Sequence, residues 1–410
     1  MKAIISGASI AGPTLAYWLH RYGWDVTVVE KAPAVRGGGY PIDVRGTALG
    51  VLDRMGVLSR VRAAHINTRR LTFLAPDGKV VGGIKPEEIT GGVEGRDIEL
   101  PRGALTTVLY DTVRDDVEWI FNDSIATLVE HGNGNGDGVA VTFRSGAARD
   151  FDVVIGADGL HSNTRRLIMG PEEPFNRYLG YCFAGFTIPN DLGLAHEGLT
   201  WSAPGRMATV YAAGCTDTLH GFLMARRPQP PLAELGDAAA QRALMAEVFA
   251  GDGSIVPRLL DGMRAADDVF FDVVSQIHLP AWSRGRVALA GDAAHAPSFF
   301  SGQGSSIALV GAYVLAGELA TAADPAAAFA AYERQTRPFV RQNQALADGG
   351  GATLAPATDR ALWFRNHVVL KLAPLLTATG LLGRDARRAT TALTLPDYSG
   401  KGNQILATAP

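Results

Sequence analysis

The chain has 410 residues, of which 47% are hydrophobic and 19% charged, enough to bury one large core or two smaller ones. Its formal net charge of -3 and the lack of a long basic cluster argue against a nucleic-acid-binding surface. Two cysteines provide neither a disulfide framework nor a metal-ligand spacing, so we expect a cytoplasmic protein without a metal site. The residues after Met1 lead directly into a strand, which does not fit a signal peptide.

The first elements in chain order form a βαβ unit. Residues 2–6 read as a short buried strand, residues 12–22 carry apolar side chains at helical spacing, and residues 25–30 read as a second buried strand. The turn Gly7-Ala-Ser-Ile-Ala-Gly12 consists of small residues, which let a pyrophosphate approach the backbone N–H groups at the helix N-terminus. This arrangement predicts an ADP-ribose site.

Two residues, Ser9 and Glu30, give further information about the nucleotide that this site can bind. Ser9 stands where the middle glycine of such a turn is usual, which is a departure from the common pattern. Glu30 ends the second strand, where a carboxylate can accept hydrogen bonds from both ribose hydroxyls and disfavours a 2′-phosphate. At this point FAD and NAD are equally compatible with the sequence. The cofactor contacts expected here are Gly7, Ser9, Ile10, Ala11, Gly12, Glu30 and Lys31.

Short helical patterns and short strands follow. A glycine-rich run at residues 131–138 is not followed by a helix, so we interpret it as a hairpin loop rather than a phosphate loop. Residues 151–155 read as a strand that leads into Gly156-Ala-Asp-Gly159. Asp158 and Gly159 are therefore expected at the end of a strand.

Aromatic-rich strands at residues 177–271 indicate a mostly antiparallel second domain. A buried strand at residues 286–290 and long helices at residues 304–322 and 325–341 then return to the first domain. The expected fold class is α/β, with a Rossmann-like cofactor-binding domain, an inserted antiparallel β-sheet substrate domain and C-terminal helices. The expected divisions are a discontinuous cofactor domain of residues 1–70, 97–176 and 276–340, a substrate domain of residues 71–96 and 177–275, and a C-terminal helical segment of residues 341–410.

Residues 361–382 are the most apolar late stretch of the chain. Charged residues and Pro374 interrupt this stretch, so a membrane span would be costly and packed terminal helices are expected instead. The sequence assigns no further function to the last residues, from 341 to 410.

Three separated motifs carry the functional signal. They are the turn from Gly7 to Gly12, the segment Asp158-Gly-Leu-His-Ser-Asn-Thr-Arg165, and Gly291-Asp-Ala-Ala-His295 followed by Gly302-Gln-Gly304. Their order and spacing resemble the single-component FAD-dependent aromatic hydroxylases, the para-hydroxybenzoate hydroxylase-like flavoprotein monooxygenases. The resemblance covers roughly residues 1 to 340 and implies FAD as the bound cofactor.

The resemblance also implies roles for single residues. Asp292 would accept hydrogen bonds from the ribitol hydroxyls of FAD. Asp158 and Gly159 match a segment associated with both FAD and NAD(P)H, and fixing the turn is their alternative role. The helix that follows Gly304 would direct its N-terminal N–H groups at the flavin pyrimidine edge. Further implied cofactor contacts are Arg45, Arg102, Gly291, Gly302, Gly304 and Ser305, and a surface position is the alternative for both arginines.

The third motif departs from the family pattern at three positions. The family has proline, asparagine and aspartate where this chain has Phe299, Ser306 and Gly311, although the spacing from His295 to Gly302 is kept. His295 is expected to pack or to stabilise a turn, because the family does not use this histidine as a base. The resemblance assigns no catalytic side chain and no metal ligand.

The resemblance implies an FAD-dependent monooxygenase that uses NADH or NADPH and O2 to hydroxylate a phenolic or polycyclic aromatic substrate, such as a polyketide-like compound, through a flavin C4a-hydroperoxide. The alternatives are an FAD-dependent reductase or dehydrogenase without oxygen insertion, an ordinary NAD-dependent dehydrogenase and a non-catalytic flavoprotein. A monomer or homodimer that binds neither nucleic acid nor membrane is expected. The candidate substrate contacts are Tyr181, Phe183, Trp201, Tyr211, Phe222 and Met224, with plain core packing as the alternative.

Overall fold

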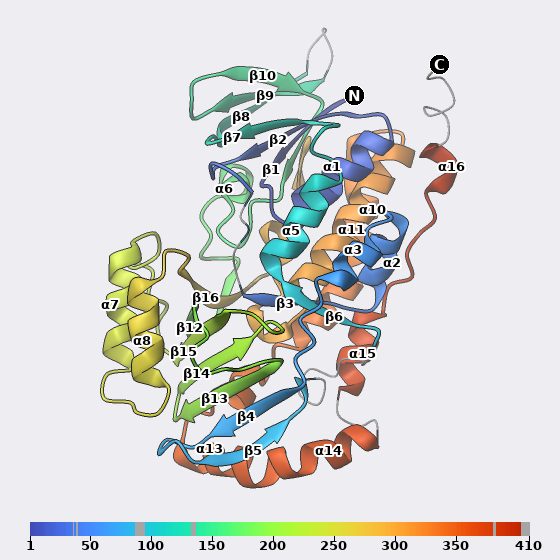
Figure 1. Ribbon diagram of the computed structural model, residues 1–410. Helices are drawn as coiled ribbons and strands as arrows, with labels where there is room; N and C mark the ends of the chain where they lie inside the picture. The colour runs from blue at the N-terminus through green and yellow to red at the C-terminus, as the bar shows by residue number, and fades with distance from the viewer. Residues whose placement is uncertain (36, 38–39, 87–94, 133–136, 380–382, 403–410) are drawn as a thin grey trace.

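The structure, a computed structural model, describes residues 1–35, 37, 40–86, 95–132, 137–379 and 383–402. It has the expected α/β architecture, with a nucleotide-binding sheet in the upper half and a second sheet in the lower half (Figure 1). Long helices run beside the first sheet, and the C-terminal helices pass below the second.

The nucleotide-binding sheet has the strand order β17-β18-β11-β1-β2-β7. Its central strands are parallel, and only β17 pairs in the antiparallel direction. Parallel strands buried on both faces are continuous apolar runs, as in Val153–Gly156. The strands are β1 (Lys2–Ser6), β2 (Asp25–Glu30), β7 (Glu118–Phe121), β11 (Val153–Gly156), β17 (Ser283–Arg284) and β18 (Val287–Leu289).

Helices α1 and α10 pack together beside this sheet, since the core joins Leu15 and Leu19 to Leu309 and Val314. Among the described helices α10 alone is long and apolar enough to cross a bilayer, but 78% of it is buried in the protein, as in a core helix. The helices of this half are α1 (Ala11–Arg21), α2 (Thr47–Arg54), α3 (Leu58–Ala63), α5 (Arg102–Asp111), α6 (Asn163–Met169), α9 (Asp292–His295), α10 (Gly304–Thr321) and α11 (Pro325–Ala345), with the 3-10 turn η1 (Phe299–Ser301).

A three-stranded antiparallel sheet comprises β8 (Ile125–His131), β9 (Gly138–Phe143) and β10 (Ala148–Phe151). The pairing of His131 with Gly138 confirms a hairpin at the glycine-rich run, whose residues 133–136 lie outside the described residues. The single strand expected at residues 151–155 is wrong. Phe151 ends β10, and β11 begins in another sheet at Val153, because the chain passes between two sheets at Asp152.

The second sheet has the order β16-β12-β15-β14-β13-β4-β5 and is antiparallel except where β13 pairs with β4. Helices α7 (Ala238–Val248) and α8 (Val256–Ala265) cover one of its faces. A two-stranded ribbon of β3 (Pro41–Val44) and β6 (Ile98–Pro101) lies between the two large sheets (Figure 1). The strands of the second sheet are β4 (Arg70–Leu74), β5 (Val80–Ile84), β12 (Asn176–Pro189), β13 (Glu197–Ala203), β14 (Arg206–Ala212), β15 (Thr218–Arg226) and β16 (Phe270–Ile277).

The C-terminal segment is helical, as expected. Its elements follow α11 and lead below the second sheet and back towards α10 (Figure 1). Leu370 and Ala373 pack against Phe73 and Ile84 of β4 and β5, which fixes the segment to the sheet. The elements are α12 (Gly350–Leu354), α13 (Asp359–Phe364), the π-helix η2 (Arg365–Val369), α14 (Leu370–Ala378), α15 (Arg384–Thr390) and α16 (Ser399–Gly402).

Candidate active site

The first turn is built for close backbone approach. A Cβ at Gly12 would lie 1.9 Å from the carbonyl oxygen of Gly7, and a Cβ at Gly7 would lie 2.4 Å from that of Ala157. Only glycine fits either position. Helix α1 starts at Ala11 without a side-chain cap, so its first N–H groups are available to an anion.

Ser9, the departure in this turn, has a partner. Its hydroxyl accepts a hydrogen bond of 2.9 Å from the guanidinium of Arg102, the first residue of α5. The serine therefore holds a cation beside the N-terminus of α1, where a pyrophosphate is expected. This contact brings together two of the predicted cofactor residues.

Glu30 is oriented by two backbone groups. Its carboxylate oxygens accept hydrogen bonds of 2.9 Å from the N–H groups of Ala8 and Ala32. Each carboxylate oxygen has a second lone pair, so the group can still accept from ribose hydroxyls. The neighbouring Lys31 is exposed at the end of β2.

Asp292 is the first residue of the short helix α9. Its side chain is solvent-accessible, yet burial raises the pKa of its carboxyl, with Arg102 acting in the opposite direction and Asp272 in the same one. Among the described residues no hydrogen bond or ion pair engages this carboxylate. It is therefore free to accept hydrogen bonds from a ligand.

The glycines of the third motif lie close to α1 and to Asp292. Gly291, with φ 58°, approaches α1 so closely that a Cβ there would lie 3.2 Å from Cβ of Ala11. A Cβ at Gly304 would lie 3.8 Å from the Asp292 carboxylate. Helix α10 begins at Gly304 without a side-chain cap, so the start of an 18-residue helix faces this region.

Ser306 and Arg45 are linked. The Ser306 hydroxyl accepts a hydrogen bond of 3.1 Å from the backbone N–H of Arg45, which ties β3 to α10. The Arg45 side chain is buried and forms an ion pair of 2.7 Å with Asp43, so it is not a surface arginine. Ser305 is also buried in this first turn of α10.

Gly311 has no side chain, which leaves room for the hydroxyl of Tyr332 as the partner of His295. Nε2 of His295 lies 3.1 Å from the hydroxyl of Tyr332, and a Cβ at Gly311 would lie 3.5 Å from that hydroxyl. Burial lowers the pKa of His295 to about 3, so the imidazole is neutral. The structure agrees with a packing role for His295, whose ring contacts that of Trp282 in a tilted arrangement with centroids 4.5 Å apart.

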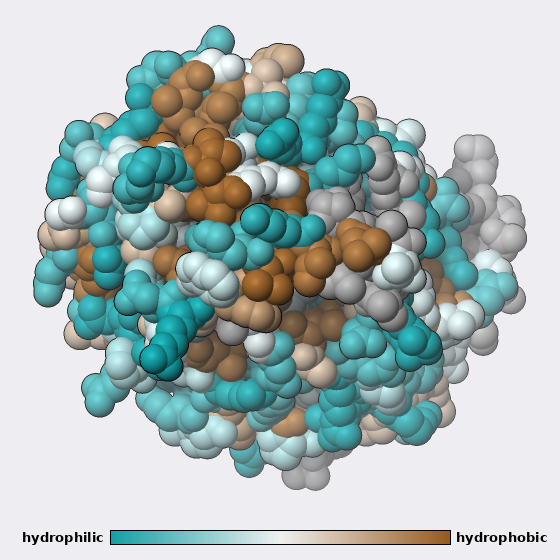
Figure 2. Space-filling view, turned by 90° about the horizontal axis from the view of Figure 1, so that it is seen from below, coloured by the Kyte–Doolittle hydropathy of each residue, from teal (hydrophilic) through white to brown (hydrophobic). Residues whose placement is uncertain are grey.

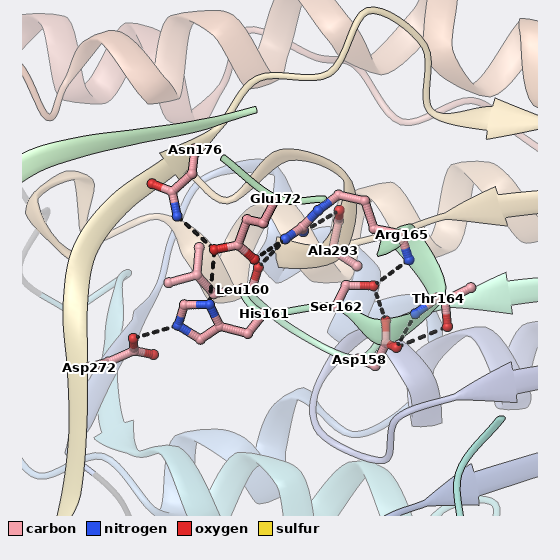
Figure 3. Close-up of polar contacts among 10 residues, drawn as sticks. All are labelled: Asp158, Leu160, His161, Ser162, Thr164, Arg165, Glu172, Asn176, Asp272 and Ala293. Atoms are coloured by element: carbon pink, nitrogen blue, oxygen red, sulfur yellow. Dashed lines mark hydrogen bonds and ion pairs between the residues drawn. The ribbon is translucent and has the colours of Figure 1, made fainter. Parts of the chain in front are cut away.

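The second motif forms a polar network around the start of α6 (Figure 3). Asp158 accepts hydrogen bonds of 2.9 Å from the backbone N–H and the hydroxyl of Thr164, and a third from the hydroxyl of Ser162. These contacts show the turn-fixing role of Asp158. Its direct contact with a cofactor, and that of Gly159 (φ 84°), stay predictions.

Arg165 joins the second motif to the third. It is 1% exposed, and its guanidinium donates to the backbone oxygens of Leu160 and Ala293 and forms an ion pair with Glu172. His161 lies on the other side of Glu172, with its ring nitrogens 3.0 Å from the carboxylates of Glu172 and Asp272 (Figure 3). Because Asp272 belongs to β16, His161 connects the two halves of the protein.

An aromatic cluster lies between the two halves. The ring centroid of Phe299 lies 5.0 Å from those of Phe183 and Phe222, with interplanar angles of 28° and 16°. Tyr40 makes an edge contact with Phe299 at 5.6 Å, and Phe270 lies 5.9 Å from Tyr40. We call these five residues the aromatic cluster. Phe299 and Tyr40 reach it from the nucleotide-binding half.

Five of the six expected substrate residues share one face of the second sheet. Tyr181, Phe183, Phe222 and Met224 form one core cluster, and Tyr211 points the same way because strand residues alternate. Trp201 is the exception. Its side chain lies on the opposite face against Phe249 under α7 and α8, so the expectation that Trp201 lines the same site as the other five is wrong.

Sequence reasoning missed Tyr40, Phe270 and Asp272. Tyr40 lies in the aromatic cluster, and its hydroxyl interacts electrostatically with Arg102, Asp292 and Asp272. Burial raises the pKa of Tyr40 to about 12, so the phenol stays protonated and can donate a hydrogen bond. No spacing signal marks these residues, because they come from separate strands and loops.

These features fit FAD. Two glycine turns allow close backbone approach, two helix N-termini lack side-chain caps, and the carboxylates of Glu30 and Asp292 can accept from hydroxyls. The donors and acceptors needed for a pyrophosphate, a ribose and a ribitol therefore lie in the half that the three motifs occupy.

Comparison with known proteins gives the same result. The FAD binding domain family matches residues 1–178 and 273–347. An uncharacterised protein of Mycobacterium tuberculosis is 45% identical over 86% of this chain and 94% of its own length. A flavin-dependent monooxygenase from an unknown prokaryotic organism is 36% identical over 97% of this chain and 99% of its own. The crystal structure of tetracycline destructase Tet(55) is 34% identical, covers 97% of this chain and 98% of its own, and has a TM-score of 0.80.

Proposed function

The chain belongs to the flavin-dependent monooxygenases with an FAD binding domain, and we propose that it hydroxylates a phenolic or polycyclic aromatic compound with NAD(P)H and O2. The observation that carries the proposal is the position of the aromatic cluster. Tyr40 and Phe299 belong to the cluster and come from the half that carries the three motifs, so the cluster adjoins the residues expected to hold FAD.

The cofactor would be held by the residues of the three motifs. Glu30 is suited to the ribose, the N-terminus of α1 with Arg102 to the pyrophosphate, and Asp292 to the ribitol. When bound, FAD supplies the electron transfer and oxygen activation of the reaction. The uncapped N-terminus of α10 favours negative charge beside it.

The protein's own part is to bind, orient and exclude water. Phe183, Phe222 and Phe299, which stack on one another, would form the aromatic wall of the substrate site. Tyr40 adds a hydroxyl that can donate to a substrate oxygen, which favours its phenolate-like form. Tyr181, Tyr211 and Met224 would complete the wall, since they lie on the same face of the sheet.

The tetracycline destructase relationship supports polycyclic polyketides as the first test compounds. We propose NADH or NADPH as the electron donor, a monomer or homodimer as the assembly, and the cytoplasm as the location. A reductase that inserts no oxygen would use the same FAD residues, and the relatives named flavin-dependent monooxygenase give it no support.

The test is a panel of tetracyclines and simple phenols incubated with the holoenzyme, NADH or NADPH, and O2. We expect at least one compound to stimulate NAD(P)H oxidation and to yield a product heavier by one oxygen atom. Double-bond reduction under anaerobic conditions, without oxygen incorporation in air, would identify the reductase instead. Stimulated oxidation that yields only hydrogen peroxide would exclude that compound as the substrate.

A further inference from the structure

An exposed apolar face runs along the C-terminal helices. Trp363 is 59% exposed, Phe364 55%, Leu372 44% and Leu375 62%. The opposite side of the same helices is buried against the second sheet, where Leu370 and Ala373 pack. The segment is therefore anchored by one side and leaves the other side open. We call Trp363, Phe364, Leu372 and Leu375 the open face.

The open face lies on the underside of the molecule. Figure 1 shows α14 passing below β4 and β5, and Figure 2 views the protein from that side. Apolar side chains gather there in a band, with polar residues around it (Figure 2). Four of the nine exposed large apolar side chains among the described residues belong to this short segment, so the clustering is not the usual scatter of single surface residues.

Basic residues outnumber acidic residues in the segment that carries the open face, where Asp359 is exposed beside Arg360. Between Asp359 and Asp385 the sequence contains no acidic residue but includes four arginine or lysine residues, Arg360, Arg365, Lys371 and Arg384, as well as His367. Arg360 and Lys371 are exposed. His367 is exposed as well and stacks on Trp363 with ring centroids 4.9 Å apart. The protein as a whole carries a net charge of -3, so this local excess of cations is a distinct feature.

Exposed tryptophan, phenylalanine and leucine with flanking cations are typical of helices that lie in the interface of a bilayer. We propose that the open face docks on the surface of an anionic phospholipid membrane. The apolar side chains would enter the interfacial layer while Arg360 and Lys371 meet the headgroups. This arrangement is peripheral, so it differs from the membrane span that the charged residues of 361–382 disfavour, and it replaces the expectation from the sequence that the protein binds no membrane.

A second copy of the chain would be a poorer occupant. A symmetric dimer through this face would place the same surface of each protomer against the other. Basic side chains outnumber acidic ones in this segment, so the two copies would bring mostly like charges together. An anionic lipid surface supplies the missing negative charge.

Trp363 provides a direct readout. It is the only one of the six tryptophans that is exposed, because Trp18, Trp24, Trp201 and Trp282 are buried and Trp119 is half-buried. Entry of Trp363 into a bilayer interface should shift its emission to shorter wavelength. We expect this shift when the holoenzyme is mixed with vesicles of phosphatidylcholine and phosphatidylglycerol, and little shift with phosphatidylcholine alone. Trp363→Phe should keep vesicle binding and lose the shift.

Co-sedimentation with the same vesicles quantifies binding. Leu372→Ser with Leu375→Ser should weaken it by roughly tenfold or more, because two leucine side chains leave the interface. Lys371→Glu should remove the preference for anionic vesicles, and added salt should weaken wild-type binding. Leu232→Ser, at a leucine that is 54% exposed elsewhere, is the matched control and should bind as the wild type does. Flavin content and circular dichroism show that each variant is folded.

Three outcomes would overturn the proposal. The proposal would be wrong if the wild-type holoenzyme sedimented with neither kind of vesicle. It would also be wrong if Leu232→Ser and the Leu372/Leu375 variant lost vesicle binding to the same extent. A concentration-dependent dimer in light scattering that disappears in the Leu372/Leu375 variant, without vesicle binding by the wild type, would assign the open face to self-association.

Discussion

The guanidinium of Arg102 donates a 2.9 Å hydrogen bond to the hydroxyl of Ser9, across 93 positions of sequence. The serine that departs from the glycine pattern of the first turn thus holds a cation where a pyrophosphate is expected. Serine is larger than the glycine that is usual at this position, but its hydroxyl holds the guanidinium of Arg102 at the turn.

We predict that Ser9→Ala weakens FAD binding. Loss of one hydrogen bond of this kind costs about 0.5–1.5 kcal/mol, so the Kd of FAD should rise about 2- to 10-fold. Titration of the apoprotein with FAD, followed by flavin fluorescence, measures the change. Arg114→Ala, at an exposed arginine soon after α5, is the control. An unchanged Kd in Ser9→Ala would mean that Arg102 is held in place without the serine.

Asp292→Asn should weaken FAD binding more strongly. A carboxylate that accepts from ribitol hydroxyls makes charge-assisted bonds of about 1.5–3 kcal/mol, so a rise of roughly 10- to 100-fold in Kd is expected. Asp115→Asn, at a carboxylate that is 87% exposed, should have no effect. Equal affinity of Asp292→Asn and the wild type would remove Asp292 from the cofactor site.

Replacing either of two glycines of α10 with alanine should change the stability of the protein in opposite directions. A Cβ at Gly311 meets only ordinary contacts, the nearest being the Tyr332 hydroxyl at 3.5 Å, so Gly311→Ala should stabilise the helix by about 0.5–1 kcal/mol. A Cβ at Gly317 would lie 2.2 Å from the ring of Tyr398, so Gly317→Ala should lower the free energy of unfolding. Thermal and chemical unfolding of the pair test this, and a lower Tm for Gly311→Ala would contradict it.

The contact of His161 with Glu172 and Asp272 should make stability depend on pH. The two carboxylates raise the pKa of His161 from 6.5 to about 9 against the effect of burial. The stabilisation is therefore complete below the unfolded-state value of 6.5 and is lost as the pH rises through about 9. His161→Gln should be less stable than the wild type at pH 6, and the difference should shrink by pH 10. A difference in unfolding free energy that stays constant over this range would refute the prediction.

Substitutions of Phe299 and Trp201 distinguish residues of the proposed substrate site from residues that only pack in the core. Phe299→Ala removes a ring that contacts Phe183 and Phe222, so the KM for a polycyclic substrate should change by roughly tenfold while the Kd of FAD stays the same. Trp201→Phe, on the opposite face of the sheet, should leave KM unchanged and lower stability. The reverse pattern would place the substrate on the other face. Steady-state kinetics with a substrate identified by product mass are required.

Much of the nucleotide site was predictable from local sequence. The turn from Gly7 to Gly12, the strand that ends at Glu30 and the helix from Gly304 are set by neighbouring residues, because glycine geometry and apolar periodicity act over a few positions. The α/β class and the FAD-binding family follow from the order of these motifs, and the family match confirms both.

The pocket was only partly predictable. Alternation along β12 and β15 places Phe183, Phe222 and Met224 on one face, but the sequence does not reveal which face α7 and α8 will cover. That choice placed Trp201 on the face opposite the aromatic cluster, which Tyr40 and Phe299 join from the other half.

The sequence alone determined the elements with short-range signals: the strands, the glycine turns, the long helices and, through the order of the motifs, the cofactor. Only the tertiary structure decided which distant side chains meet. The pairs Ser9 with Arg102, Ser306 with Arg45, and His295 with Tyr332 form because sheet order and helix packing bring separate segments to contact distance. No local pattern encodes these distances, since each depends on the packing of the whole chain.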